Sequence, residues 1–234
     1  MYAPIRYASV GLVLGLSITL AGCSNADKPK PADTTASTST STSTTTSKST
    51  PSTTAKSPQA ASERPTIQDY IAKNGITETP IERGDAGPSI DLPVPDGWQT
   101  TDKFADAAPY GAIVYTESAV PANPPRILAV LSKLTGNVDP QKILDLASGE
   151  LNNIPGFDGP SEGDRGTLGG YEAVQLGGRY DAEGKQGMIA QKTVVIPGQD
   201  GVYVLQLNAY SDESEAGILT TATDLVDEKT TITP

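Results

Sequence analysis

The chain has 234 residues, of which 17 are basic and 28 acidic, so its formal net charge is −11; it contains no histidine and one cysteine. The missing imidazole excludes histidine-based catalytic triads and histidine metal sites, and the single thiol excludes an intrachain disulfide or a cysteine-rich zinc site. The acidic balance opposes binding to a phosphate backbone, so we expect no nucleic-acid partner.

The first 22 residues have the pattern of a bacterial lipoprotein signal peptide. As a helix, the apolar stretch 8–20 would be about 20 Å long, too short to cross a hydrocarbon core of about 30 Å. It leads into Leu20-Ala21-Gly22-Cys23, where small residues admit a peptidase and the following thiol accepts a lipid. An ordinary secretory signal with an incidental cysteine is the alternative. We predict lipidation of Cys23 with acyl chains such as palmitate, and anchoring on the outer, periplasmic or extracellular face of the cell membrane.

Residues 23–64 are predicted to be the lipidated cysteine followed by a disordered tether. Between residues 34 and 54, 18 of the 21 positions are Ser or Thr. Such a segment buries too little apolar surface to offset the entropy that it would lose on ordering. Its Ser/Thr clusters with interspersed proline also suit O-glycosylation.

Residues 65–234 are predicted to form one domain, with 11 basic and 25 acidic side chains. Thr66 and Asp69 form a capping-box pattern that begins a helix, and Gly75 ends it. Extended segments are expected at residues 89–93, 110–116 and 127–134. The third of these is apolar on both faces, which is typical of a central strand.

The second half of the domain predicts a helix, a strand meander and a last helix. Asp139 and Pro140 begin a helix whose apolar residues recur at helical spacing as far as Ile154. Strands joined by short turns are expected at residues 170–180, 187–196 and 202–209, with a turn at 181–184. The last helix begins at Ser211 or Asp212. This order predicts an α+β fold in which helices pack on a mainly antiparallel sheet.

Several segments of the domain resemble the LpqN/LpqT family of mycobacterial lipoproteins. The resemblance covers residues 66–234 and includes residues 74–76 (Asn-Gly-Ile), 90–95 (Ile-Asp-Leu-Pro-Val-Pro), 131–136 (Leu-Ser-Lys-Leu-Thr-Gly), 191–197 (Gln-Lys-Thr-Val-Val-Ile-Pro) and 230–234 (Thr-Thr-Ile-Thr-Pro). It implies a Mog-type/PsbP-like fold, in which an antiparallel sheet is sandwiched by helices. It also implies a part in the export of mycolate-type envelope lipids beside large membrane transporters, or binding to host proteins. The family offers no catalytic motif to transfer to this chain.

No catalytic or phosphate-binding motif was found in the sequence. A G-x-S-x-G elbow and a P-loop are both absent, and the acidic group Asp212, Glu213 and Glu215 lacks the spacing of a calcium loop. Acidic side chains in the first turn of a helix are instead favoured by its dipole. We therefore expect no cofactor, no metal and no enzymatic activity.

Aromatic side chains are the candidate ligand-binding residues. Trp98, Tyr110 and Tyr115 lie near expected strand ends and loops, where such side chains can line an apolar slot. Packing in the core and at strand edges is the alternative. Tyr110, directly after Pro109 at a strand start, is expected at the rim of the slot.

These observations favour a non-enzymatic, lipid-anchored envelope protein. Its domain would bind an amphipathic lipid or a membrane-transport partner and assist the trafficking of envelope lipids. A different class of function is a protein-interaction module without a ligand cavity, acting on host proteins, and a third is a hydrolase with two separated carboxylates. We expect a monomer. An apolar cavity between sheet and helix would favour the lipid-binding hypothesis over the protein-interaction module.

Overall fold

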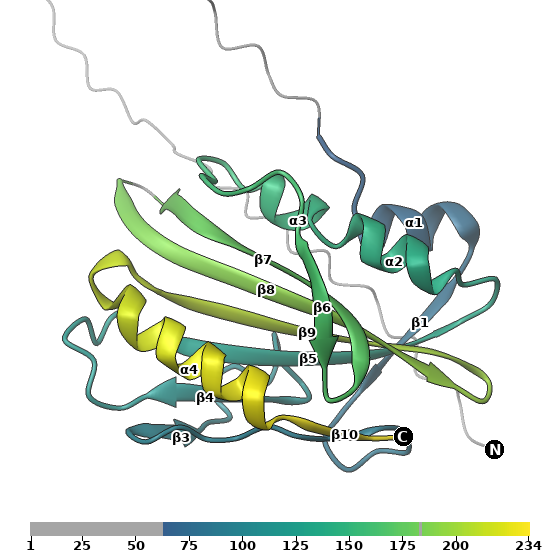
Figure 1. Cartoon of the computed structure of the whole chain (residues 1–234), viewed down its shortest axis with the longest axis horizontal. Helices are drawn as coiled ribbons and strands as arrows, with labels where there is room; N and C mark the ends of the chain where they lie inside the picture. Colours follow the sequence, from purple (N-terminus) through teal and green to yellow (C-terminus); the bar gives the residue numbers. More distant parts are fainter. Residues whose placement is uncertain (1–62, 183) are drawn as a thin grey trace, which may run out of the picture. The chain divides into compact units, whose positions relative to one another are not determined.

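This computed structural model describes residues 63–182 and 184–234. Its main element is a twisted antiparallel sheet (Figure 1). Its strands are β1 Thr77–Ile81, β3 Trp98–Thr100, β4 Gly111–Tyr115, β5 Arg126–Thr135, β6 Asp164–Leu168, β7 Tyr171–Ala182, β8 Lys185–Gly198 and β9 Gly201–Asp212. They lie in the order β3-β4-β5-β9-β8-β7-β6, and β1 pairs with the end of β5 that β4 does not reach. A small second sheet joins β2 (Ser89–Asp91) to β10 (Thr231–Thr233).

Helices cover both faces of the main sheet. One face carries α1 (Ile67–Asn74), α2 (Pro140–Leu146) and α3 (Gly149–Asn152), and the other carries α4 (Ala216–Lys229), which follows a 3-10 turn at Glu213–Glu215 (Figure 1). Side chains alternate along a strand, so β9 directs Val204 toward α1 and α2 and directs Leu205 toward α4. The predicted α+β class with an antiparallel sheet between helices is therefore confirmed.

The first helix begins and ends where its local sequence predicts. The Thr66 hydroxyl accepts the Asp69 N–H at 3.1 Å, and an Asp69 carboxylate oxygen accepts the Thr66 N–H at 2.8 Å, which completes the capping box. Gly75 ends the helix in the left-handed region at φ 61°, where only a residue without Cβ is unstrained.

The continuous helix expected from Asp139 to Ile154 is wrong, because the chain breaks after α2 and resumes as the single turn of α3. Gly149, directly after the break, lies close to the chain that enters α1. A Cβ at this position would lie 2.2 Å from the carbonyl oxygen of Pro65, so the glycine lets the chain entering α1 pass directly over α3. Glycine also lowers the helical propensity of the segment.

Four short strands, β1, β3, β6 and β10, were not expected. They have three to five residues each, and most of their side chains are exposed. Their pairing comes from backbone hydrogen bonds to a longer neighbour, so no alternation of apolar residues marks them in the sequence.

The predicted signal peptide, Cys23 and nearly all of the predicted tether lie outside the described residues, as does Glu183 in the predicted turn at 181–184. Within the part of the chain that the structure describes, every helix is too short or too polar to cross a membrane.

Candidate functional site

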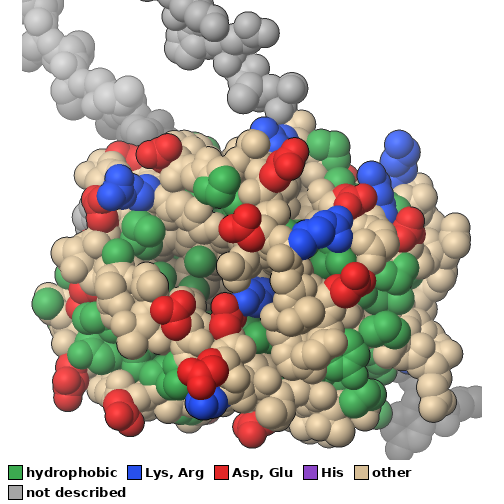
Figure 2. All heavy atoms as spheres, in the orientation of Figure 1, with side chains coloured by type: hydrophobic (Ala, Val, Ile, Leu, Met, Phe, Trp, Pro, Cys, Tyr) green, Lys and Arg blue, Asp and Glu red, His purple; other side chains and the backbone are tan. Residues whose placement is uncertain are grey.

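The main candidate site is a hollow of about 270 Å³ between α4 and the sheet, which we call the α4 hollow. Its floor is apolar and includes Ile127, Ala190, Leu207 and Ala209. Its rim is polar and includes Asp164, Gln175, Lys192, Thr223, Asp224 and Asp227. Figure 2 shows this face of the molecule hollowed near its centre, with acidic side chains around the opening. An apolar floor with a few polar groups at the mouth suits a ligand that is itself amphipathic.

Small residues on neighbouring strands create the space beneath α4. Gly177 on β7 pairs with Ala190 on β8, which pairs with Ala209 on β9. All three line the α4 hollow. A Cβ at Gly177 would already lie 3.2 Å from the Ala190 Cβ. Space is therefore left between α4 and the sheet, because three adjacent strands place small side chains side by side there.

One largely buried cation, Lys192, lies among the carboxylates of the α4 hollow. The Lys192 ammonium lies 2.5 Å from an Asp227 carboxylate oxygen, and the Lys192 side chain is only 13% exposed. Asp164 and Asp224 also line the hollow. Since Asp227 already neutralises Lys192, the remaining charge at the rim is acidic. An anionic head group would be repelled at this opening.

A second hollow, of about 440 Å³, lies beyond Ile127 and is named here the Arg83 hollow. Ile127 and Val226 line both this hollow and the α4 hollow. The Arg83 guanidinium lies 4.9 Å from the centre of the Tyr110 ring, a distance at which the cation is attracted to the ring face. Val94, which is 46% exposed, lies on the wall of this hollow.

The three aromatic residues predicted to bind a ligand do not form one slot. Trp98 and Tyr115 pair across strands with ring centres 5.9 Å apart, and both line a third, more open hollow beside Ile218 and Leu225. Tyr110 lines the Arg83 hollow instead. The expectation that Tyr110 lies at a rim is wrong, because it is 3% exposed and its hydroxyl accepts the Ile90 N–H at 2.7 Å. This bond ties the short β2–β10 sheet to the core.

The acidic group at the start of the last helix has a structural role. Glu215 is 5% exposed, and its carboxylate accepts the Ser118 hydroxyl at 2.7 Å and the Ala119 N–H at 2.9 Å. Glu213 pairs with Arg179 on β7. No group of three or more acidic, histidine or cysteine side chains that could hold a metal ion is found among residues 63–182 and 184–234.

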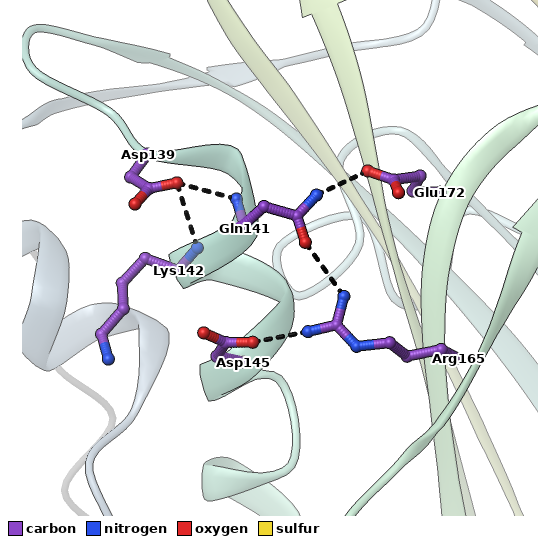
Figure 3. A network of polar contacts seen from close by, with 6 residues as sticks. All are labelled: Asp139, Gln141, Lys142, Asp145, Arg165 and Glu172. Carbon is purple, nitrogen blue, oxygen red and sulfur yellow. Dashed lines mark hydrogen bonds and ion pairs between the residues drawn. The ribbon is translucent and has the colours of Figure 1, made fainter.

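A polar network on the opposite face positions α2. Gln141 donates from its amide nitrogen to Glu172 at 2.7 Å and accepts from Arg165 at 3.1 Å, while Arg165 also pairs with Asp145 (Figure 3). Asp139 accepts the backbone N–H of Gln141 and so caps the helix, as its position in the sequence predicts. These side chains are exposed, so the network orients α2 on β6 and β7 with little effect on stability.

No direct sign of the α4 hollow is visible in the sequence, since its floor is made of ordinary small and branched side chains. One available signal was Gly177-Gly178 inside the strand expected at residues 170–180. Glycine in the interior of a strand often marks a place where another group approaches closely.

Comparisons with known proteins agree with each other. The sequence model of a family described as "Probable lipoprotein LpqN" matches residues 63–233. Lipoprotein LpqN of Mycobacterium tuberculosis is 52% identical to this chain over 230 residues, which are 98% of this chain and 99% of that protein. A crystal structure of LpqN, described as involved in cell envelope biogenesis of Mycobacterium tuberculosis, has a TM-score of 0.70 and 55% identity, over 72% of this chain and 98% of the solved one.

Proposed function

Because the chain belongs to the LpqN family of lipoproteins, we propose that it is a lipid-anchored protein of the cell envelope that binds an amphipathic lipid and catalyses no reaction. The relative of known structure is described as involved in envelope biogenesis, and we propose the same general process for this chain. Lipidation at Cys23 would hold the domain on the outer face of the membrane, where envelope lipids and their transporters are within reach.

The observation that carries the lipid-binding proposal is the α4 hollow. Its floor combines Ile127, Leu207 and Ala209, each nearly fully buried, with the half-buried Ala190. Acyl groups gain about 0.8 kcal/mol for each methylene that leaves water, so a floor of this kind favours a hydrocarbon chain. The polar rim would keep the head group in contact with water, and its acidic charge favours a head group that is not anionic.

The proposal is tested by asking whether a lipid occupies this hollow. We would purify the full-length protein from its own host without detergent exchange, and look for a co-purifying lipid by native mass spectrometry. The delipidated protein would then be titrated with monolaurin, a neutral lipid with one acyl chain. Ala190→Leu adds three carbons to the floor of the hollow, and binding should weaken by about tenfold or more because several methylenes lose their place.

A matched control adds the same atoms elsewhere. Ala72 lies on the exposed side of α1, on the opposite face of the sheet, so Ala72→Leu should bind monolaurin as the wild type does. Undiminished binding by Ala190→Leu would remove the α4 hollow from the site. If the wild type neither carries a lipid nor binds monolaurin, the protein-interaction module expected as the alternative takes the place of the lipid-binding proposal.

A further inference from the structure

We infer that the α4 hollow and the Arg83 hollow are two ends of one channel, which holds a single long acyl chain beneath α4 and in which Val226 decides how long a chain is accepted. This inference rests on the lipid-binding function proposed above and adds the chain-length class of the ligand. Its basis is the register of the sheet together with the two residues that the hollows share.

One cross-strand row lines both hollows from end to end. Successive pairs in the sheet run from β3 to β7 through Thr100, Ile113, Ile127, Ala209, Ala190 and Gly177. The first three residues of this row line the Arg83 hollow, and the last four line the α4 hollow, with Ile127 common to both. The two hollows are therefore stretches of the same trough across the sheet.

The two hollows border each other at two side chains. Val226 projects from α4 toward the sheet, and Ile127 lies in the trough; these are the only two residues shared by the two sets of lining side chains among the described residues. Both are 3% exposed. Rotation of either side chain, or a small outward shift of α4, would join the hollows without disturbing the strand pairing below.

The dimensions of the trough suit a whole acyl chain. The row crosses six strands, which is five spacings of about 4.8 Å, or about 24 Å in all. An acyl chain of an ordinary membrane lipid spans half of a hydrocarbon core of about 30 Å. The trough can thus take a whole chain of that kind lying flat across the strands. The α4 hollow alone, at about 270 Å³, holds only part of one.

Charged side chains set the direction of the chain. Four of them line the α4 hollow, and only two, Arg83 over the Tyr110 ring and Asp102, line the Arg83 hollow. Lys192, Asp224 and Asp227 line the α4 hollow and offer hydrogen-bond partners to a neutral head group there. Beyond Val226 the row continues with Ile113, which is buried, and Thr100. We therefore assign the head group to the opening of the α4 hollow and the end of the chain to the Arg83 hollow.

The test is a series of monoacylglycerols of increasing chain length, monocaprylin, monolaurin and monopalmitin, titrated into the delipidated full-length protein. With a continuous channel, affinity should keep rising as far as monopalmitin, by at most about fourfold for each methylene that is buried. Thr100→Phe fills the far end at an exposed position, so the fold should be retained. It should weaken monopalmitin binding by about tenfold or more, because several terminal methylenes lose their place, and leave monocaprylin binding unchanged.

Two control variants separate the channel from general effects of packing. Gln99→Phe adds an aromatic ring at the adjacent, exposed position of β3, whose side chain points to the other face of the sheet; it should bind all three lipids as the wild type does. Val226→Phe should weaken monopalmitin binding more than monocaprylin binding, because Val226 lines both hollows. Leu219→Phe changes another buried residue of α4 that lines neither hollow, so it should not discriminate between the short and the long lipid.

The possible results distinguish the two proposals. If the wild type binds none of the three lipids, the proposed function itself fails. If it binds them with the same affinity beyond monocaprylin, and Thr100→Phe changes nothing, the α4 hollow is a site that ends at Val226 and the channel is refuted. Equal losses for short and long lipids in Thr100→Phe would also refute the channel, because they would place the head group in the Arg83 hollow.

Discussion

The buried carboxylate of Glu215 should be one of the most important single side chains for the stability of this domain. It joins the start of α4 to the loop between β4 and β5, through the Ser118 hydroxyl and the Ala119 N–H. A hydrogen bond to a charged group contributes about 1.5–3 kcal/mol. Part of this gain offsets the cost of removing the carboxylate from water. Ala119 is an exposed residue, so water can reach its N–H once the carboxylate is gone.

For Glu215→Ala we therefore expect a loss of about 2–3 kcal/mol in the free energy of unfolding. In a domain of roughly 170 residues, each kcal/mol lowers Tm by about 2–4 °C, so Tm should fall by about 5–10 °C. Glu215→Gln keeps both contacts if its amide oxygen accepts the Ala119 N–H and its amide nitrogen donates to Ser118. Its loss should be about 1 kcal/mol, since only the contribution of the charge disappears.

The assay is urea unfolding at neutral pH, followed by circular dichroism, with Tm measured in parallel. Glu213→Ala is the matched control, two residues away in the same turn. Glu213 is 40% exposed and pairs with Arg179 at the surface, so its removal should cost less than about 1 kcal/mol. If Glu215→Ala loses no more stability than Glu213→Ala, the assigned role of the buried carboxylate is wrong.

Three further predictions concern the anchor, the core and alkaline pH. Cys23→Ser should release the protein from the membrane fraction, because the acyl chains on this thiol are the proposed anchor; equal membrane retention in a detergent-phase fractionation would contradict lipidation. Tyr110→Phe should lose about 1–2 kcal/mol in denaturant unfolding, since the buried Ile90 N–H loses its acceptor, and Tyr110→Asp should fail to fold by circular dichroism. Burial raises the pKa of Tyr210, with Arg126 partly opposing the shift; a raised folded-state pKa contributes stability below the unfolded value of about 10 that is lost as pH rises. The loss of stability above that pH should be smaller in Tyr210→Phe, and identical pH profiles would contradict this cause.

Sequence reasoning succeeded where the signal is local. Thr66, Asp69 and Gly75 mark the ends of α1 within ten residues of chain, and each of their expected contacts is present. The long strands β5, β8 and β9 were also located, because apolar runs and turn residues bound them. Expected ends differ from observed ones by a few residues, as pairing extends a strand beyond its apolar centre.

The α4 hollow could not be predicted from the sequence, because its floor forms only through the register of the paired strands. Ala190, Ala209 and Ile127 are far apart in the chain, and each is an unremarkable residue in an apolar segment. They become one floor only when β8, β9 and β5 pair in the observed register. The large aromatic residues were predicted to bind the ligand because such side chains can line an apolar slot. Tyr110 is instead part of the core, and the α4 hollow lies where the side chains are smallest.

The stability cost of this hollow is itself informative about function. Glycine within a strand costs about 0.5–1 kcal/mol relative to alanine, and a nearly buried lysine such as Lys192 needs Asp227 to be tolerated. A domain under selection for stability alone would gain by replacing Ala190 with a larger apolar side chain, because the space above it is already free. Ala190→Leu should therefore be at least as stable as the wild type while binding lipid less well. That combination, higher stability with lower binding, is what distinguishes a binding site from a packing defect.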